Sequence, residues 1–159
     1  MKSTLYIPKG LPASGKSTWA RKKVLNEDGV YIVSRDSIRE MLAADYKSFP
    51  FGHSELEQVV TEGVLEMVTL LLSLDYSVIL DETNLNQGRL SKLINEVTKD
   101  LEVVNPTSEF TVEHIDFTNV PLEECIKRDQ ERERTVGKHV IKGMHKKYLA
   151  HESPHKNTT

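Results

Sequence analysis

The stretch GLPASGKST at residues 10–18 has the composition and spacing of a phosphate-binding loop. Four residues separate its two glycines, and a lysine and a hydroxyl residue follow the second one. A glycine-rich turn lets successive backbone N–H groups point into one concavity, and the dipole of a following helix adds positive potential there. In such loops the lysine reaches the β- and γ-phosphates of a nucleotide, and the hydroxyl binds Mg²⁺. The residues expected to hold ATP and Mg²⁺ here are Gly10, Pro12, Ala13, Ser14, Gly15, Lys16, Ser17 and Thr18.

A carboxylate and a guanidinium lie close together in the stretch SRDSIRE at residues 34–40. Asp36 and Arg39 are three residues apart, so at the start of a helix they share one face. Beside a γ-phosphate, Asp36 could accept the proton of an attacking hydroxyl, and Arg39 could bind a phosphate of the acceptor. Taken alone, the pair is more typical of a helix-capping aspartate next to a solvated arginine. Next to a phosphate-binding loop, it indicates a general base and an acceptor contact.

Two adjacent acids end the apolar stretch SVIL, in the sequence DETNLN at residues 81–86. An acid at this position of a Walker-type site assists Mg²⁺, and we expect Asp81 to do so together with Ser17. Glu82, Thr83 and Asn84 are the expected substrate contacts at the rim of the cleft. A turn that merely favours Asp, Thr and Asn is the alternative.

An arginine-rich stretch, KRDQERERTVGKHV, occupies residues 127–140. Arg128 and Arg132 are four residues apart and are expected on one face of a helix that ends before Gly137. Cations on a helix–loop–helix could close over a triphosphate and stabilise the transferring phosphoryl group. The interleaved acids leave a second interpretation open, a solvated charged helix.

Alternating strand and helix patterns must position these residues. Ser54 and Glu57 have the spacing of a capping box, which indicates that the longest helix begins here. Alternation of this kind predicts an α/β fold, a parallel sheet covered on both faces by helices, with ligands at the carboxyl ends of the strands. Strands are expected at residues 4–8, 29–34, 77–82 and 110–117, and helices at 16–25, 37–44, 54–74, 87–101, 121–132 and 138–149.

Composition limits the classes of protein that remain. The 159 residues suffice for one domain, and the net charge of −3 argues against a nucleic-acid site spread over the whole surface. No apolar run has the length of a membrane helix, no signal peptide is evident, and the single cysteine, Cys125, suits a reducing cytosol. Cys125 is expected to be buried, and no aromatic-rich strip stands out that would mark where bases stack.

The motifs GLPASGKSTWAR, SRDSIRE, DETNLN and KRDQERERTVGKHVIKGMHKKY together resemble the kinase domain of bacteriophage polynucleotide 5′-hydroxyl kinases and their bacterial end-repair relatives. The resemblance spans nearly the whole chain. It implies a P-loop kinase fold with four to five parallel strands and an arginine-bearing helical lid. It also implies an active-site tunnel that admits ATP–Mg²⁺ at one end and the 5′ end of DNA or RNA at the other.

The resemblance further implies individual roles. Asp36 matches the general base, and Lys16 and Ser17 match the phosphate-loop pair. Arg39 matches the arginine on the acceptor's 3′-phosphate, Arg132 the lid arginine on the transferred phosphate, and Arg128 a nucleotide contact. The family's Asp-Thr-Asn reads Glu82-Thr83-Asn84 here, so either Asp81 or Glu82 could be the acid of the site.

The resemblance also indicates how the chain is divided. Residues 1–151 are expected to form the kinase domain, and residues 152–159 a polar tail. The 3′-phosphatase often fused to such kinases is not expected, because the chain has no Asp-x-Asp-x-Thr motif.

Three hypotheses follow. The first is an ATP-dependent kinase that acts on 5′-hydroxyl ends in nucleic-acid end repair. The second is a P-loop kinase for a nucleoside, nucleotide or sugar hydroxyl; Arg39 favours an acceptor with a phosphate beside its hydroxyl, and hence the first hypothesis. The third is a non-catalytic nucleotide-binding protein, against which the complete set of candidate residues argues. A GTPase is not expected, because no Asn-Lys-x-Asp guanine reader is present.

Overall fold

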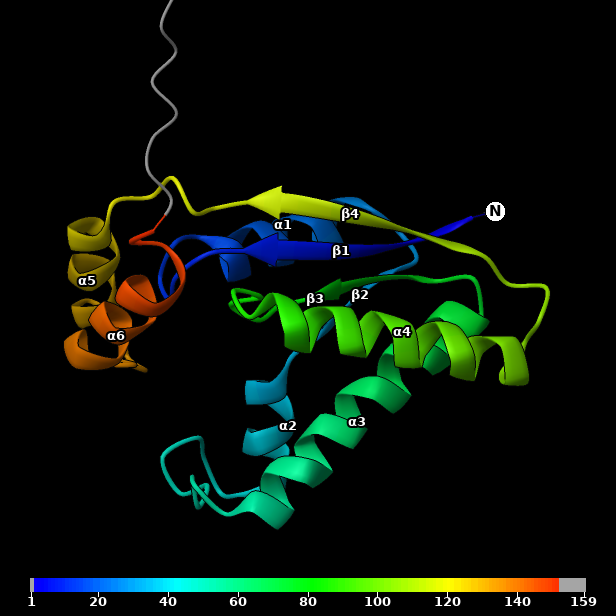
Figure 1. The fold of residues 1–159 in the computed structure, drawn as a ribbon, viewed down its shortest axis with the longest axis horizontal. Helices are drawn as coiled ribbons and strands as arrows, with labels where there is room; N and C mark the ends of the chain where they lie inside the picture. The colour runs from blue at the N-terminus through cyan, green and yellow to red at the C-terminus, as the bar shows by residue number, and fades with distance from the viewer. Residues whose placement is uncertain (1, 152–159) are drawn as a thin grey trace, which may run out of the picture.

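Four parallel strands form the central sheet of the computed structural model, which describes residues 2–151 (Figure 1). The strand order is β2-β3-β1-β4, so β1 and β3 are the inner strands. Every pairing is parallel, with Leu5 opposite Val78 and Val112. The prediction of a parallel α/β sheet is confirmed. The strands are β1 (Ser3–Lys9), β2 (Val30–Val33), β3 (Ser77–Leu80) and β4 (Phe110–Asp116).

Helices cover both faces of the sheet, as predicted. On one face, α1 (Lys16–Asn26) packs Ala20 against Val30 and Ile79. On the other, α3 (Ser54–Ser73) and α4 (Gln87–Val104) form the larger core with the strands. The fully buried side chains of that core include Leu5, Ile7, Val60, Val68, Leu72, Val78 and Val97.

Three further helices stand at the carboxyl ends of the strands, where Figure 1 shows α5 and α6 beyond the arrowheads of β1 and β4. They are α2 (Arg35–Leu42), α5 (Leu122–Gln130) and α6 (Lys138–Tyr148). A small core of Cys125, Ile126 and Ile141 joins α5 to α6 and also includes Leu11 and Leu85. This pair of helices is therefore anchored on the phosphate-loop segment, and the expected burial of Cys125 is confirmed.

The structure excludes one local alternative and corrects one local prediction. Asp36 is not the cap of α2: Ser34 is, and its hydroxyl accepts a hydrogen bond from the Ser37 N–H at 3.3 Å. The first lid helix, α5, ends at Gln130, so Arg132 lies in the following turn and not on the same helix as Arg128. The expected polar tail at residues 152–159 lies outside the described residues. None of the helices within residues 2–151 combines the length and apolar character needed to cross a bilayer.

Candidate active site

The phosphate loop joins β1 to α1 through a backbone that few side chains could adopt. Gly15, the N-cap of α1, has φ +106°, in the region that favours glycine. Gly10 packs closely, since a Cβ there would lie 2.7 Å from Ser14 Oγ and 2.8 Å from Phe117 Cβ. Gly15 is therefore needed for the backbone turn into α1, and Gly10 for the close packing of the loop against Ser14 and Phe117.

Lys16 is buried at the base of this loop, with 6% of its surface exposed. Its ammonium group donates to the carbonyl oxygens of Gly10 at 2.9 Å and Leu11 at 2.6 Å, and to Ser14 Oγ at 3.3 Å. Burial lowers the pKa of Lys16 to about 8, and the charge of Asp81 opposes that shift. The loop therefore holds a desolvated cation through groups that phosphate oxygens could replace.

A cleft of ≈ 1000 Å³ opens beside the loop and brings together most of the residues that the sequence indicated. Three strand ends and the lid segment contribute to it. Gly10, Pro12 and Ser14 do not line it; they are buried and support the loop from behind. The predicted residues that line the cleft are Ala13, Gly15, Lys16, Ser17, Thr18, Asp36, Asp81, Arg128 and Arg132.

The two acids at the end of β3 point into different spaces. Asp81 lines the cleft with Lys16 and Ser17, whereas Glu82 lines a second pocket of ≈ 430 Å³. Burial raises the pKa of Glu82, and the nearby charge of Arg35 opposes this. β3 ends at Leu80, and the Glu82 N–H donates to the Leu80 carbonyl oxygen at 2.9 Å, so the chain turns between the two acids and directs them to different sides. Of the two acids, Asp81 is the one placed beside the phosphate loop.

Thr83 and Asn84 also line the second pocket and not the cleft. The Asn84 side-chain amide donates to the carbonyl oxygens of Pro8 at 2.8 Å and Leu80 at 2.9 Å. It is 93% buried and has φ +51°. Asn84 therefore links the carboxyl ends of β1 and β3 through hydrogen bonds, a structural role that the sequence did not indicate.

Ser17 and Asp81 offer a hydroxyl and a carboxylate on the same cleft. Mg²⁺ is commonly bound by one or two carboxylates together with water and substrate phosphates, so this donor set suits it. Within residues 2–151 there is no cluster of three or more His, Cys, Asp or Glu side chains that could hold a metal ion. A magnesium ion at this place would depend on the phosphates of a bound nucleotide.

Asp36, in the first turn of α2, lies between two guanidinium groups. Its Oδ1 accepts from Arg39 at 2.8 Å, and its Oδ2 accepts from Arg134 at 2.6 Å. Arg134 comes from the loop between α5 and α6, and it also pairs with Glu40. The sequence indicated Arg39 at this carboxylate but not Arg134, whose only signal was its place in the ERER run at residues 131–134.

Glu57, on α3, holds Arg39 from the other side. Its carboxylate accepts from Arg39 Nη2 at 2.7 Å and Nε at 3.1 Å, and from Arg35 Nη2 at 2.7 Å. The hydrogen bonds from Arg39 lower the pKa of Glu57; burial opposes them, and Arg35 adds to them. The expected capping box does not form, because His53 is the N-cap of α3 and no side chain caps it.

The lid segment is organised by Asp129, which is 1% exposed. Its carboxylate accepts from the backbone N–H groups of Val136 and Gly137 and pairs with Arg132. Burial alone would raise the pKa of Asp129, but these three donors lower it. Arg128 pairs with Glu124 on its own helix at 3.0 Å. Of the acids interleaved in this stretch, Asp129 pairs with Arg132, but it is buried and not solvated, and Arg128 and Arg132 both face the cleft.

The parallel sheet, with the phosphate-binding loop between β1 and α1, defines a P-loop kinase fold. The chain matches the family described as an AAA domain, AAA_33, over residues 5–151, and it belongs to that family. Within the family it is of the P-loop kinase type, a class to which nucleotide binding is general.

Three similar proteins illustrate the range of the fold. The chain is 30% identical over 149 residues to an L-seryl-tRNA(Sec) kinase of Methanococcus maripaludis, covering 91% of this chain and 52% of that protein. A chain in the structure of the Pnkp1/Rnl/Hen1 RNA repair complex is 26% identical with a TM-score of 0.73, over 90% of this chain and 43% of that one.

A gluconokinase from Sinorhizobium meliloti shares the fold alone, at 13% identity and a TM-score of 0.50, over 99% of this chain and 78% of that one. The chain thus spans about half the length of its curated relative and less than half of the RNA-repair chain.

Proposed function

We propose that this protein transfers the γ-phosphoryl group of ATP to the 5′-hydroxyl end of DNA or RNA, a reaction of nucleic-acid end repair. The observation that carries the proposal is the convergence of Lys16, Asp36 and Arg132 on one cleft, with Arg39 bonded to Asp36. The similarity to a chain of an RNA repair complex supports the choice of a nucleic-acid acceptor.

The donor half of the cleft would bind the triphosphate. Backbone N–H groups of the loop and the N-terminus of α1 face the β- and γ-phosphates, and Lys16 exchanges its loop carbonyls for phosphate oxygens. Ser17 and Asp81 would hold Mg²⁺, which neutralises phosphate charge when bound. Arg132, and Arg128 beside it, face the phosphates from the lid side.

The acceptor half would orient the hydroxyl. A phosphate that follows the first nucleoside attracts Arg39 and leaves one carboxylate oxygen of Asp36 for the 5′-hydroxyl. The bond from O5′ to the γ-phosphorus forms as the bond to the β-bridging oxygen breaks, ADP leaves, and the hydroxyl proton passes to Asp36. Lys16 and Arg132 stabilise the charge on the equatorial oxygens during this in-line transfer.

A second acceptor is favoured by the comparison with the seryl-tRNA kinase. In that case the hydroxyl belongs to a group attached to RNA and not to a strand end, while the donor half and Asp36 keep their roles. A free nucleoside or sugar is a third acceptor; it would leave Arg39 without a phosphate to bind.

The test is transfer of labelled γ-phosphate from ATP to a panel of acceptors. The panel holds 5′-OH DNA and RNA oligonucleotides, nucleoside 3′-monophosphates, seryl-tRNA, nucleosides and sugars. Wild type is compared with Asp36→Asn and with Glu40→Gln, which removes a neighbouring carboxylate that also pairs with Arg134.

Label on strand ends and 3′-monophosphates, lost in Asp36→Asn and kept in Glu40→Gln, is the expected result. Label confined to seryl-tRNA, or to nucleosides and sugars, would overturn the strand-end assignment and keep the kinase.

A further inference from the structure

The loop between α2 and α3 gathers three aromatic side chains from the short stretch YKSFPF at residues 46–51. Phe51 meets Tyr46 edge-to-face at 5.0 Å and Phe49 at 5.2 Å between ring centroids. Phe49 is buried and supports the group, whereas 48% of Phe51 is exposed. The expectation that no aromatic-rich strip stands out overlooked this stretch, whose three rings contact one another in the folded loop.

Two arginines connect these rings to the candidate reaction centre. The guanidinium carbon of Arg39 lies 5.4 Å from the ring centroid of Phe51, and that of Arg134 lies 4.0 Å from the centroid of Tyr46. Both guanidinium groups also bond to Asp36. The aromatic cluster thus begins one side chain away from the candidate general base.

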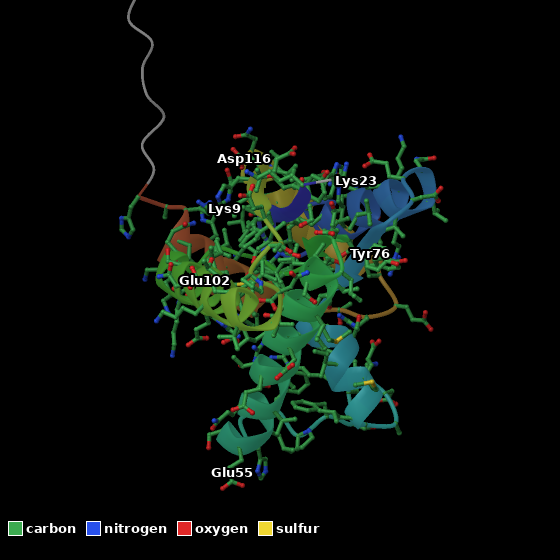
Figure 2. All side chains as sticks on the ribbon, turned by 90° about the vertical axis from the view of Figure 1, so that its right-hand side faces the viewer. Lys9, Lys23, Glu55, Tyr76, Glu102 and Asp116 are labelled. Atoms are coloured by element: carbon green, nitrogen blue, oxygen red, sulfur yellow. The ribbon has the colours of Figure 1, made fainter. Side chains whose placement is uncertain are left out.

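The loop extends the acceptor side away from the sheet. Figure 2 shows Glu55, in the first turn of α3 just after this loop, at the opposite end of the molecule from Asp116 at the end of β4. A strand that entered the cleft at Asp36 could pass over the loop without crossing the phosphate-binding side.

We propose that Tyr46 and Phe51 form a platform on which the bases of a single-stranded acceptor stack next to the reacting end. The proposal rests on the proposed function and names the substrate class of the same site. Aromatic side chains with adjacent arginines bind unpaired bases whatever their sequence, because every base has a π-face. A paired base in a duplex is already stacked on its neighbours and does not offer that face.

Charge near the platform is compatible with a phosphate backbone. Lys47 and His53 are exposed on the same loop, and Asp45 is its one carboxylate. The carboxylates of Asp36 and Glu40 already pair with Arg134. Arg39 likewise pairs with Asp36 and Glu57, so a phosphate that binds either arginine next to the rings must displace a carboxylate.

The position of Arg39 specifies which base stacks. If Arg39 binds the phosphate between the first and second nucleosides, the ring of Phe51 beside it contacts the second base. A nucleoside 3′-monophosphate reaches Arg39 but has no second base. The platform should therefore improve the KM of an oligonucleotide and leave that of a 3′-monophosphate unchanged.

The experiment compares wild type, Phe51→Ala and Phe51→Trp with Leu25→Ala, a control that truncates an exposed apolar side chain on α1. KM is measured for a single-stranded 5′-OH oligonucleotide, the same strand in a blunt duplex, and a nucleoside 3′-monophosphate. Binding is followed separately by the fluorescence of 2-aminopurine at the second position, and thermal unfolding checks the fold of each variant.

We expect Phe51→Ala to raise the KM of the single strand roughly 5- to 100-fold, the loss of one base–aromatic stack, and to abolish quenching of 2-aminopurine. Phe51→Trp and Leu25→Ala should behave as wild type, and the 3′-monophosphate should respond to none of them.

Equal KM values for wild type and Phe51→Ala on the oligonucleotide would overturn the platform and leave the strand-end kinase intact. Quenching that depends on Phe51, with no transfer to any strand end, would support the platform and overturn the proposed reaction. Preference for the blunt duplex, or no quenching by wild type, would overturn the platform.

Discussion

The donor half of the cleft is formed mainly by backbone atoms, and the acceptor half mainly by side chains. The donor half is made by backbone: glycine conformations, loop carbonyls and the start of α1 create the site, and Lys16 is bonded to atoms within six residues of it. The acceptor half is made by side chains from α2, α3 and the lid, joined through the ion pairs of Asp36, Arg39 and Glu57. Changes in one half should therefore leave the other half working, and the following predictions test that separation.

The largest effect is expected for Asp36→Asn. The amide cannot accept the hydroxyl proton, so kcat should fall about 10²- to 10⁴-fold, the usual contribution of a general base. The Kd for ATP should stay within a factor of about two, because Asp36 is not bonded to the phosphate loop. A parallel loss of ATP affinity, measured by titration calorimetry, would show that the two halves are not separable.

Glu57→Gln should come next, and its effect should be confined to the acceptor half. It leaves Arg35, which is 92% buried, without its carboxylate partner, so the free energy of unfolding should fall by about 1.5–3 kcal/mol. The KM for a phosphate-bearing acceptor should also rise, because Arg39 loses its support, while the KM for ATP is unchanged. Chemical denaturation and steady-state kinetics measure the two effects.

The pH dependence of stability gives an independent check on Glu57. Its pKa is lower in the folded than in the unfolded protein, so its stabilisation is complete above the unfolded pKa and is lost as the pH falls through the folded pKa. Wild type should therefore lose stability more steeply than Glu57→Gln as the pH falls below about 5. Parallel curves for the two proteins would contradict the role of Glu57.

Gly10→Ala is the matching change in the donor half. Its Cβ would press on Ser14 Oγ and on Phe117, whose backbone oxygen lies 3.0 Å away, so we expect a loss of about 1–3 kcal/mol and weaker ATP binding. Gly143→Ala on α6 is the control, because a Cβ there meets nothing within 4 Å and should stabilise the helix. Acceptor KM should not respond to either change once ATP is saturating.

The smallest effect concerns the proton on Lys16. Its pKa is about 8 in the free protein, and phosphate oxygens favour its charged form, so nucleotide binding above pH 8 should take up a proton. Affinity for ATP should then fall with rising pH, by at most about tenfold per unit. Calorimetry in buffers of different ionisation enthalpy measures the proton uptake, and Lys16→Met should abolish it.

The donor half is also the half that the sequence predicts well. Glycine spacing, a preceding strand and a following helix are local signals, and the loop that they indicated lines the cleft with Lys16 and Ser17. The four strands were found for the same reason, because each has its own run of β-branched and aromatic residues.

The acceptor half was only partly predictable because its partners are distant along the chain. Arg39 meets Glu57 across 18 residues, and Asp36 meets Arg134 across 98. A capping box and a solvated helix were reasonable local explanations for Glu57 and for the arginine run, and no local pattern distinguishes them from these long-range pairs. The division between Asp81 and Glu82 likewise needed the exact end of β3.

The buried carboxylate of Asp129 determines how the lid segment could move. It accepts hydrogen bonds from the amides of Val136 and Gly137 and so holds them at the end of α5, while Arg134 in the same loop forms an ion pair with Asp36 on α2. Release of Arg134 would therefore free the loop from α2 while Asp129 keeps it folded against α5, and α5 and α6 stay anchored on Leu11 and Leu85. The amide protons of Val136 and Gly137 should exchange slowly with solvent whether or not Arg134 is paired, and Asp129→Asn should make them exchange quickly.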